Sequence, residues 1–196
     1  AWLACRAATL YRRMGDPGHA HVWAARAWRL GHDIGDPRAL IEAALELANL
    51  ALDRDSLDEA HEWAARAPEF AGANEFARYR GSVALLRAQL WLLDERLEEA
   101  TGAAGEALEA IHMSGEGRHL VTCYAVRSII ALRRGNPPAA IEWLDQARQA
   151  LRAQIEHIPN LAERDRFLDA VPLRRWLHSR ADLALLDRSW RHTRSL

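Results

Sequence analysis

Small side chains recur in this chain every 40 residues, and this spacing limits the fold more than any other property. When the sequence is divided into rows of 40, four columns consist almost wholly of alanine. The columns are Ala20, Ala60, Ala100 and Ala140; Ala24, Ala64, Ala104 and Leu144; Ala27, Ala67, Ala107 and Ala147; and Ala8, Ala48, Ala88 and Ser128. Spacings of three and four residues put such positions on one helix face. Each row is therefore predicted to be a pair of closely packed helices.

A turn is predicted near the middle of each row. Asp16 and Asn136 are typical N-cap residues, and each is followed by a proline at the first helical position. Ser56 and Glu59 match a capping box. The third turn has no such signal, so its position follows from the alanine columns alone. The four predicted turns are Gly15-Asp16-Pro17, Asp55-Ser56-Leu57, Glu95-Arg96-Leu97 and Gly135-Asn136-Pro137.

These signals predict helices separated by short loops. Asp36 caps the third helix, Pro68 is expected to end the fourth, and Asn74 is expected to cap the fifth. Loops are expected over 69–73 and 114–117, and the last residues of the chain are expected to fray. The predicted helices span residues 1–14, 17–33, 37–53, 57–67, 75–93, 97–112, 118–134, 137–156, 161–170 and 172–186.

The first row resembles the tetratricopeptide (TPR) repeat in its small residues, its aromatic residue and its Gly-Asp turn. The matching residues are Ala8, Tyr11, Gly15, Asp16, Ala20, Ala24 and Ala27. The period here is 40 residues, whereas a TPR repeat has 34. The Leu expected one place before the small residue of the first helix is present as Leu47. It is replaced in the other rows by Ala7, Arg87 and Arg127.

The resemblance implies an all-α fold, a right-handed α-solenoid of four TPR-like helix hairpins followed by C-terminal capping helices. The array would cover residues 1–160. The capping helices would cover residues 161–196, where apolar side chains are expected to cover the last apolar face of the array, as solenoids require. The repeats would be 1–40, 41–80, 81–120 and 121–160.

In a TPR array the first helix of each hairpin lines a concave groove, so the resemblance also implies a set of partner-binding residues. A TPR clamp for a C-terminal carboxylate needs Lys four residues before Asn, but Leu45 precedes Asn49, so a chaperone-tail binder is not expected. The alternative is that these side chains form a solvated helix face. The groove residues carried over by position are Trp2, Thr9, Arg12, Arg13, Glu42, Asn49, Asp53, Ser82, Gln89, Thr122 and Arg133, with Leu52, Leu92 and Ile129 between them.

Residues 166–172, Arg-Phe-Leu-Asp-Ala-Val-Pro, resemble the C-terminal TPR region of bacterial signalling ATPases and MalT-like transcription regulators. This resemblance implies a cytoplasmic sensor or regulatory module that binds a protein or peptide and packs on an upstream ATPase or effector domain. The chain begins inside a helical pattern at Ala1, so we expect it to be part of a longer protein. The alternatives are a scaffold that self-associates as a homo-oligomer and, as a minor one, an enzyme.

Charge and composition argue against several other classes of protein. The net charge is −1, so no direct nucleic-acid contact is expected, and no apolar run is long enough to cross a membrane. Cys5 and Cys123 lie three repeats apart, which disfavours a disulfide and indicates a reducing compartment. Trp23, Trp63 and Trp143 share a column, so they are expected to pack between helices.

The sequence lacks the residue spacings of common metal-binding and catalytic motifs. His19 and His21 point in different directions on a helix, and His61 lacks a second His four residues on. The glycines near 115 lack the Lys and the preceding strand of a phosphate loop, and no serine sits in a nucleophile elbow. We therefore expect no metal, no cofactor and no catalytic residues.

Overall fold

The computed structural model describes residues 1–70, 77–115, 117–169, 171–179 and 187. Within these residues the chain forms ten α-helices and one short 3-10 helix, with no strand. The elements are α1 (Trp2–Arg13), α2 (Pro17–Ile34), α3 (Pro37–Asp53), α4 (Leu57–Phe70), α5 (Ala77–Leu93), α6 (Leu97–Ser114), η2 (Gly117–His119), α7 (Leu120–Arg133), α8 (Pro137–Glu156), α9 (Leu161–Asp169) and α10 (Pro172–His178).

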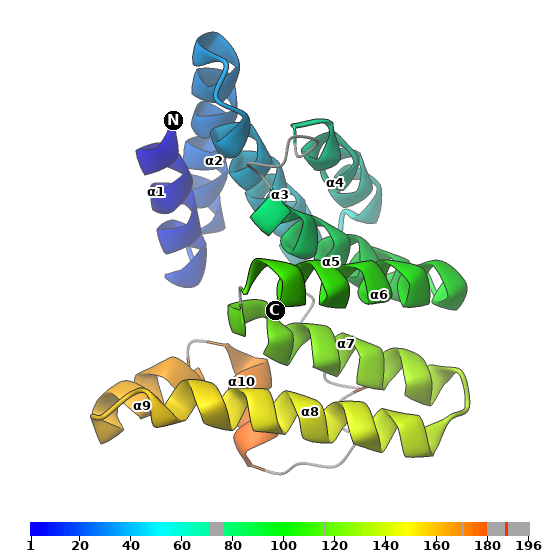
Figure 1. Ribbon diagram of the computed structural model, residues 1–196. Coiled ribbons are helices and arrows are strands. Elements are labelled where there is room, and N and C mark those ends of the chain that lie inside the picture. The colour runs from blue at the N-terminus through cyan, green and yellow to red at the C-terminus, as the bar shows by residue number, and fades with distance from the viewer. Residues whose placement is uncertain (71–76, 116, 170, 180–186, 188–196) are drawn as a thin grey trace.

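The helices stack in the order in which they occur in the sequence. Each odd-numbered helix from α1 to α7 packs against the helix that follows it, and each hairpin packs against the next (Figure 1). Successive first helices also contact one another, as α1 with α3, α3 with α5 and α5 with α7, more extensively than successive second helices do. The architecture is therefore that of an all-α helical repeat.

The same turn geometry returns in every hairpin. Residues with a left-handed φ occur at Gly15, Asp55, Glu95 and Gly135, with values of 75°, 65°, 61° and 74°. One residue later, a backbone N–H donates to the carbonyl five residues back at 2.9–3.0 Å in all four turns, for example from Arg96 to Trp91. Such a bond closes the C-terminal turn of the first helix. The 40-residue spacing in the sequence thus corresponds to one turn of the same geometry in each hairpin.

Three of the four N-caps predicted from Asp and Asn are confirmed, and the fourth, Asn74, lies outside the described residues. The Oδ1 of Asp16 accepts from the His19 N–H at 3.0 Å, that of Asn136 from Ala139 at 3.2 Å, and that of Asp36 from Arg38 at 3.1 Å. These bonds satisfy N–H groups that lack a partner within the first helical turn.

The other two turns use different contacts. Glu59 does not complete a capping box with Ser56, because both of its carboxylate oxygens accept from Nη2 of Arg54 at 2.9 Å. In the third turn Arg96 occupies the cap position without a side-chain cap bond. Its guanidinium lies 4.2 Å from the ring centroid of Trp91, and its Nε donates to Glu99 at 2.9 Å. This hydrogen bond lowers the pKa of the Glu99 carboxyl.

The alanine columns are confirmed as the contact faces between helices. Ala20, Ala60, Ala100 and Ala140 are fully buried, and the members of the other three columns are 3 % exposed or less. Ser128 stands where the other rows have alanine, and its buried hydroxyl donates to the carbonyl of Ala140 at 2.7 Å. A polar side chain is accepted in this column because it finds a partner on the facing helix.

Four predicted boundaries are wrong by two residues or more. The seventh helix begins at Leu120, because residues 117–119 form the 3-10 helix η2, and α10 ends at His178 with Ser179 as its C-cap. Pro68 does not end α4, which continues to Phe70, so 69–70 are helical rather than loop. A proline removes only one helix hydrogen bond, and near the end of a helix few residues remain to be disturbed. The sixth helix extends two residues beyond the predicted end, to Ser114, and Gly115 with φ 70° ends it. Residues 71–76, 180–186 and 188–196, on which the other predictions for these loops, helices and the C-terminus fall, lie outside the described residues.

The apolar core is distributed along the array. Two clusters join α1, α2 and α3, two more join α3, α4 and α5, and the largest runs from α5 to α10. Helix α10 packs against α8, and α9 packs against α10. Leu168, Leu173 and Leu177 of these two short helices join the last cluster.

The three tryptophans of the shared column are half-buried, and arginine guanidinium groups cover them. Arg26 lies over Trp23, Arg66 over Trp63 and Arg127 over Trp143, at 5.1, 4.4 and 4.1 Å from the ring centroids.

Candidate partner-binding face

The residues predicted to line a groove lie on α1, α3, α5 and α7, and we call this surface the first-helix face. The structure places them at very different depths. Trp2, which is 51 % exposed, Arg13 and Asp53 are open to solvent, whereas Gln89 is only 6 % exposed. Leu52, Leu92 and Ile129 are buried. The half-buried members are Thr9, Arg12, Glu42, Asn49, Ser82, Thr122 and Arg133.

Glu46 contacts two of the predicted residues, Thr9 and Arg12, at the N-terminal end of this face. Arg12 donates from Nε to Glu46 at 2.6 Å and lies 4.0 Å from Asp53. The Thr9 hydroxyl lies 3.3 Å from Glu46 and 3.2 Å from the carbonyl of Cys5. Glu46 is 7 % exposed, so its charge is desolvated and needs this pairing. Glu46 is not among the predicted residues, although it lies four residues after Glu42 and so on the same helix face.

Further along the face, polar side chains again connect one first helix to the next. The Tyr79 hydroxyl of α5 donates to Glu42 of α3 at 2.7 Å. The hydroxyl of Ser82 lies 3.1 Å from Nε2 of His119, the residue before α7. Neither Tyr79 nor His119 was predicted. Several of the predicted binding residues therefore make polar contacts within the chain, between neighbouring first helices.

Arg133, at the C-terminal end of α7, makes a different kind of contact. Its Nη1 donates to the carbonyl of Leu92 at 2.9 Å, and its Nε donates to Oδ1 of Asp187 at 2.8 Å. Asp187 follows the hairpins and is 54 residues away in sequence. The first-helix face thus receives a carboxylate from a part of the chain outside the repeats.

Reactive groups elsewhere are few. Both cysteines are free and buried, and burial raises the pKa of the Cys5 thiol to about 12 and that of Cys123 to about 11. A thiol with such a pKa is not a nucleophile near neutral pH. Among the described residues, no three His, Cys, Asp or Glu side chains gather as a metal site would require. No helix in that part of the chain has the length and apolar character of a membrane span.

Comparison with known proteins adds no family. No protein-family model matches the chain, and no curated protein matches its sequence. The contacts of the first-helix face are therefore the basis on which a function can be proposed.

Proposed function

We propose that the chain is a protein- or peptide-binding module of the TPR-like class, a right-handed solenoid whose first helices line its concave side. The observation that carries the proposal is the bond from Arg133 to Asp187. A carboxylate that belongs to none of the hairpins is bound by a guanidinium on the first-helix face. An acidic residue of a partner would be recognised by the same chemistry.

Arg133 suits this role because its guanidinium is oriented before a partner arrives. One nitrogen is occupied by the Leu92 carbonyl, so another points toward the carboxylate. Charge-assisted hydrogen bonds of this kind contribute about 1.5–3 kcal/mol. Asp187 then acts as an internal competitor, and a partner displaces it.

We further propose that the module is the sensor or regulatory part of a larger bacterial signalling ATPase or MalT-like transcription regulator in the cytoplasm, and that it is not an enzyme. An exposed apolar surface favours an adjoining domain, because Leu3 and Leu10 on α1 and Met14 at its C-cap are each more than half exposed. The same apolar surface favours the alternative of a scaffold that self-associates. Sedimentation at several concentrations separates the two, since a monomer at all concentrations contradicts the scaffold.

The experiment compares three variants on an array of peptides that carry a central Asp, each matched to the same peptide with Asn. Arg133→Gln should weaken binding of the Asp peptides by about tenfold or more, because about 1.4 kcal/mol corresponds to tenfold. Asp187→Asn should strengthen it by removing the competitor. Arg54→Gln is the control, because Arg54 pairs with Glu59 in the turn before α4. Equal binding by all variants, or no preference for Asp peptides, would contradict the proposal.

A further inference from the structure

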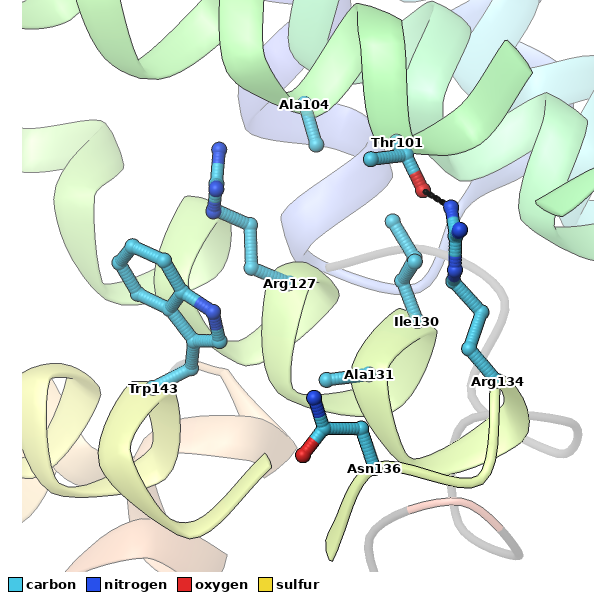
Figure 2. Close-up of a pocket in the computed structure, with 8 residues that line it drawn as sticks. All are labelled: Thr101, Ala104, Arg127, Ile130, Ala131, Arg134, Asn136 and Trp143. Carbon is cyan, nitrogen blue, oxygen red and sulfur yellow. Dashed lines mark hydrogen bonds between the residues drawn. The ribbon is translucent and has the colours of Figure 1, made fainter. Parts of the chain in front are cut away.

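A pocket of about 330 Å³ lies between α6, α7 and α8, away from the residues of the first-helix face. Figure 2 shows its lining, in which two guanidinium groups, from Arg127 and Arg134, flank an apolar wall that includes Ile130. Polar side chains from Thr101 and Asn136 complete it, together with the ring of Trp143. Its volume is near the lower end for small-molecule sites.

Arg127 is the first indication of a ligand. Its guanidinium lies 4.1 Å from the ring centroid of Trp143, and its Nε is buried without a hydrogen-bond partner. It has no ion pair with any residue that the structure describes. Its Nη1 lies close to the facing helix, because a Cβ added at Gly105 would be in van der Waals contact with it at 3.8 Å. A cation fixed by stacking, with an unsatisfied buried N–H, favours an anion beside it.

Arg134 brings a second positive charge that is already fixed in place. Its Nη1 donates to Glu98 at 3.0 Å and to the Thr101 hydroxyl at 3.1 Å. The Thr101 proton is used in turn, because that hydroxyl donates to the carbonyl of Leu97 at 2.7 Å. Thr101 therefore has no proton to offer a ligand, and it serves to orient Arg134. Glu98 is exposed and pairs with Arg134 only, so the guanidinium of Arg127 is left without a carboxylate among the described residues.

Asn136 offers a third donor because of its role as a cap. Its Oδ1 accepts from the Ala139 N–H, so the amide NH₂ must point the other way. In Figure 2 that nitrogen points toward Ala131 and the pocket. The groups available to a ligand are thus N–H donors, set beside apolar side chains.

We propose that this pocket binds a small organic anion. Its carboxylate or phosphate group lies between Arg127 and Arg134 and accepts from the Asn136 amide, while its apolar part packs on Ile130 and the edge of Trp143. Arginine forks match the oxygens of both head groups. The lining residues come from α6, α7, α8 and the turn between α7 and α8, and none of them is among the residues assigned to the first-helix face.

The test uses three probes in calorimetric titrations of the whole chain: benzoate, phenyl phosphate and benzylamine. At least one of the two anions should bind saturably, and benzylamine should not bind. The stronger anion identifies the head group. Arg127→Gln and Arg134→Gln should each weaken binding about tenfold or more, whereas Arg54→Gln, the same charge change at a distant turn, should leave it unchanged.

Asn136→Asp is the decisive variant, since it separates folding from binding. Aspartate caps a helix as well as asparagine does, so the thermal unfolding midpoint should be preserved. The new carboxylate replaces a donor by a negative charge, so anion binding should fall about tenfold or more. Absence of saturable anion binding by the unaltered chain overturns the proposal. Binding that survives both Arg127→Gln and Asn136→Asp in folded protein overturns it equally.

Discussion

Glu95 takes a left-handed backbone conformation, with φ at 61°, where two of the other hairpins carry glycine. Residues with a Cβ meet their own carbonyl oxygen in this region, at a cost of about 1–2 kcal/mol. Aspartate tolerates the region better than glutamate, so the equivalent Asp55 is less strained. The repeat therefore imposes a turn geometry on a residue that does not favour it.

We expect Glu95→Gly to raise the free energy of unfolding by about 0.5–1 kcal/mol, because glycine removes the strain but gains freedom in the unfolded chain. Urea unfolding followed by circular dichroism measures the change. Gly135→Ala, which introduces a Cβ at the equivalent turn, should lower stability by about 1 kcal/mol. If Glu95→Gly were destabilising, the turn would not be strained by its side chain.

At the level of the elements, the predicted helices agree best with the structure where the signal is local. Asp16, Asp36 and Asn136 mark helix starts through bonds to residues two or three positions on, and the alanine columns mark contact faces. The sequence could not reveal which groove residues pair across helices. The bond from Arg12 to Glu46 joins α1 and α3, and that from Tyr79 to Glu42 joins α5 and α3, so both depend on how the helices stack.

The same limit applies to the two surfaces proposed for binding. Asp187 reaches Arg133 across 54 residues, and the pocket gathers side chains from three helices, so neither follows from spacing along the chain. The cap position of Asn136 was predictable, and its cap bond to Ala139 fixes the direction of its amide NH₂, but the pocket that lies in that direction depends on how α6, α7 and α8 stack. The helices and their contact faces were thus predictable from periodic residues. The polar contacts between side chains of different helices were not.

The packing of α5 on α6 can be tested with a pair of glycines. A Cβ on Gly81 would lie 2.7 Å from Cγ1 and 3.3 Å from the backbone nitrogen of Ile111, whereas a Cβ on Gly102 would meet nothing within 4 Å. Gly81→Ala should cost about 1–2 kcal/mol of stability because overpacking exceeds the gain in helix propensity. Gly102→Ala should stabilise by up to about 1 kcal/mol.

Urea midpoints of the two variants provide the measurement, and Ile111→Ala provides the control. With Cγ1 removed, the further cost of Gly81→Ala should shrink, which a double-mutant cycle reports as a coupling between the two sites. If Gly81→Ala cost the same with and without Ile111, the helices would not approach as closely as described.

At the scale of the whole molecule, stability should be divided among neighbouring hairpins, because the apolar clusters follow one another along the chain. Leu47 packs with residues of α1 and α2, and Leu151 packs with residues of α7 and the C-terminal helices. No described cluster joins these two leucines. In such an array each repeat is stabilised by its neighbours, and destabilisation spreads only locally.

Leu47→Ala should therefore speed amide hydrogen exchange in α1 to α4 and leave α8 protected, and Leu151→Ala should do the reverse. Each substitution removes a buried side chain and costs about 2–5 kcal/mol locally. Mass spectrometry of peptic fragments locates the change along the chain. The two variants control each other, because they make the same chemical change at opposite ends. Faster exchange in every helix for both variants would mean one cooperative core and would contradict a linear stack.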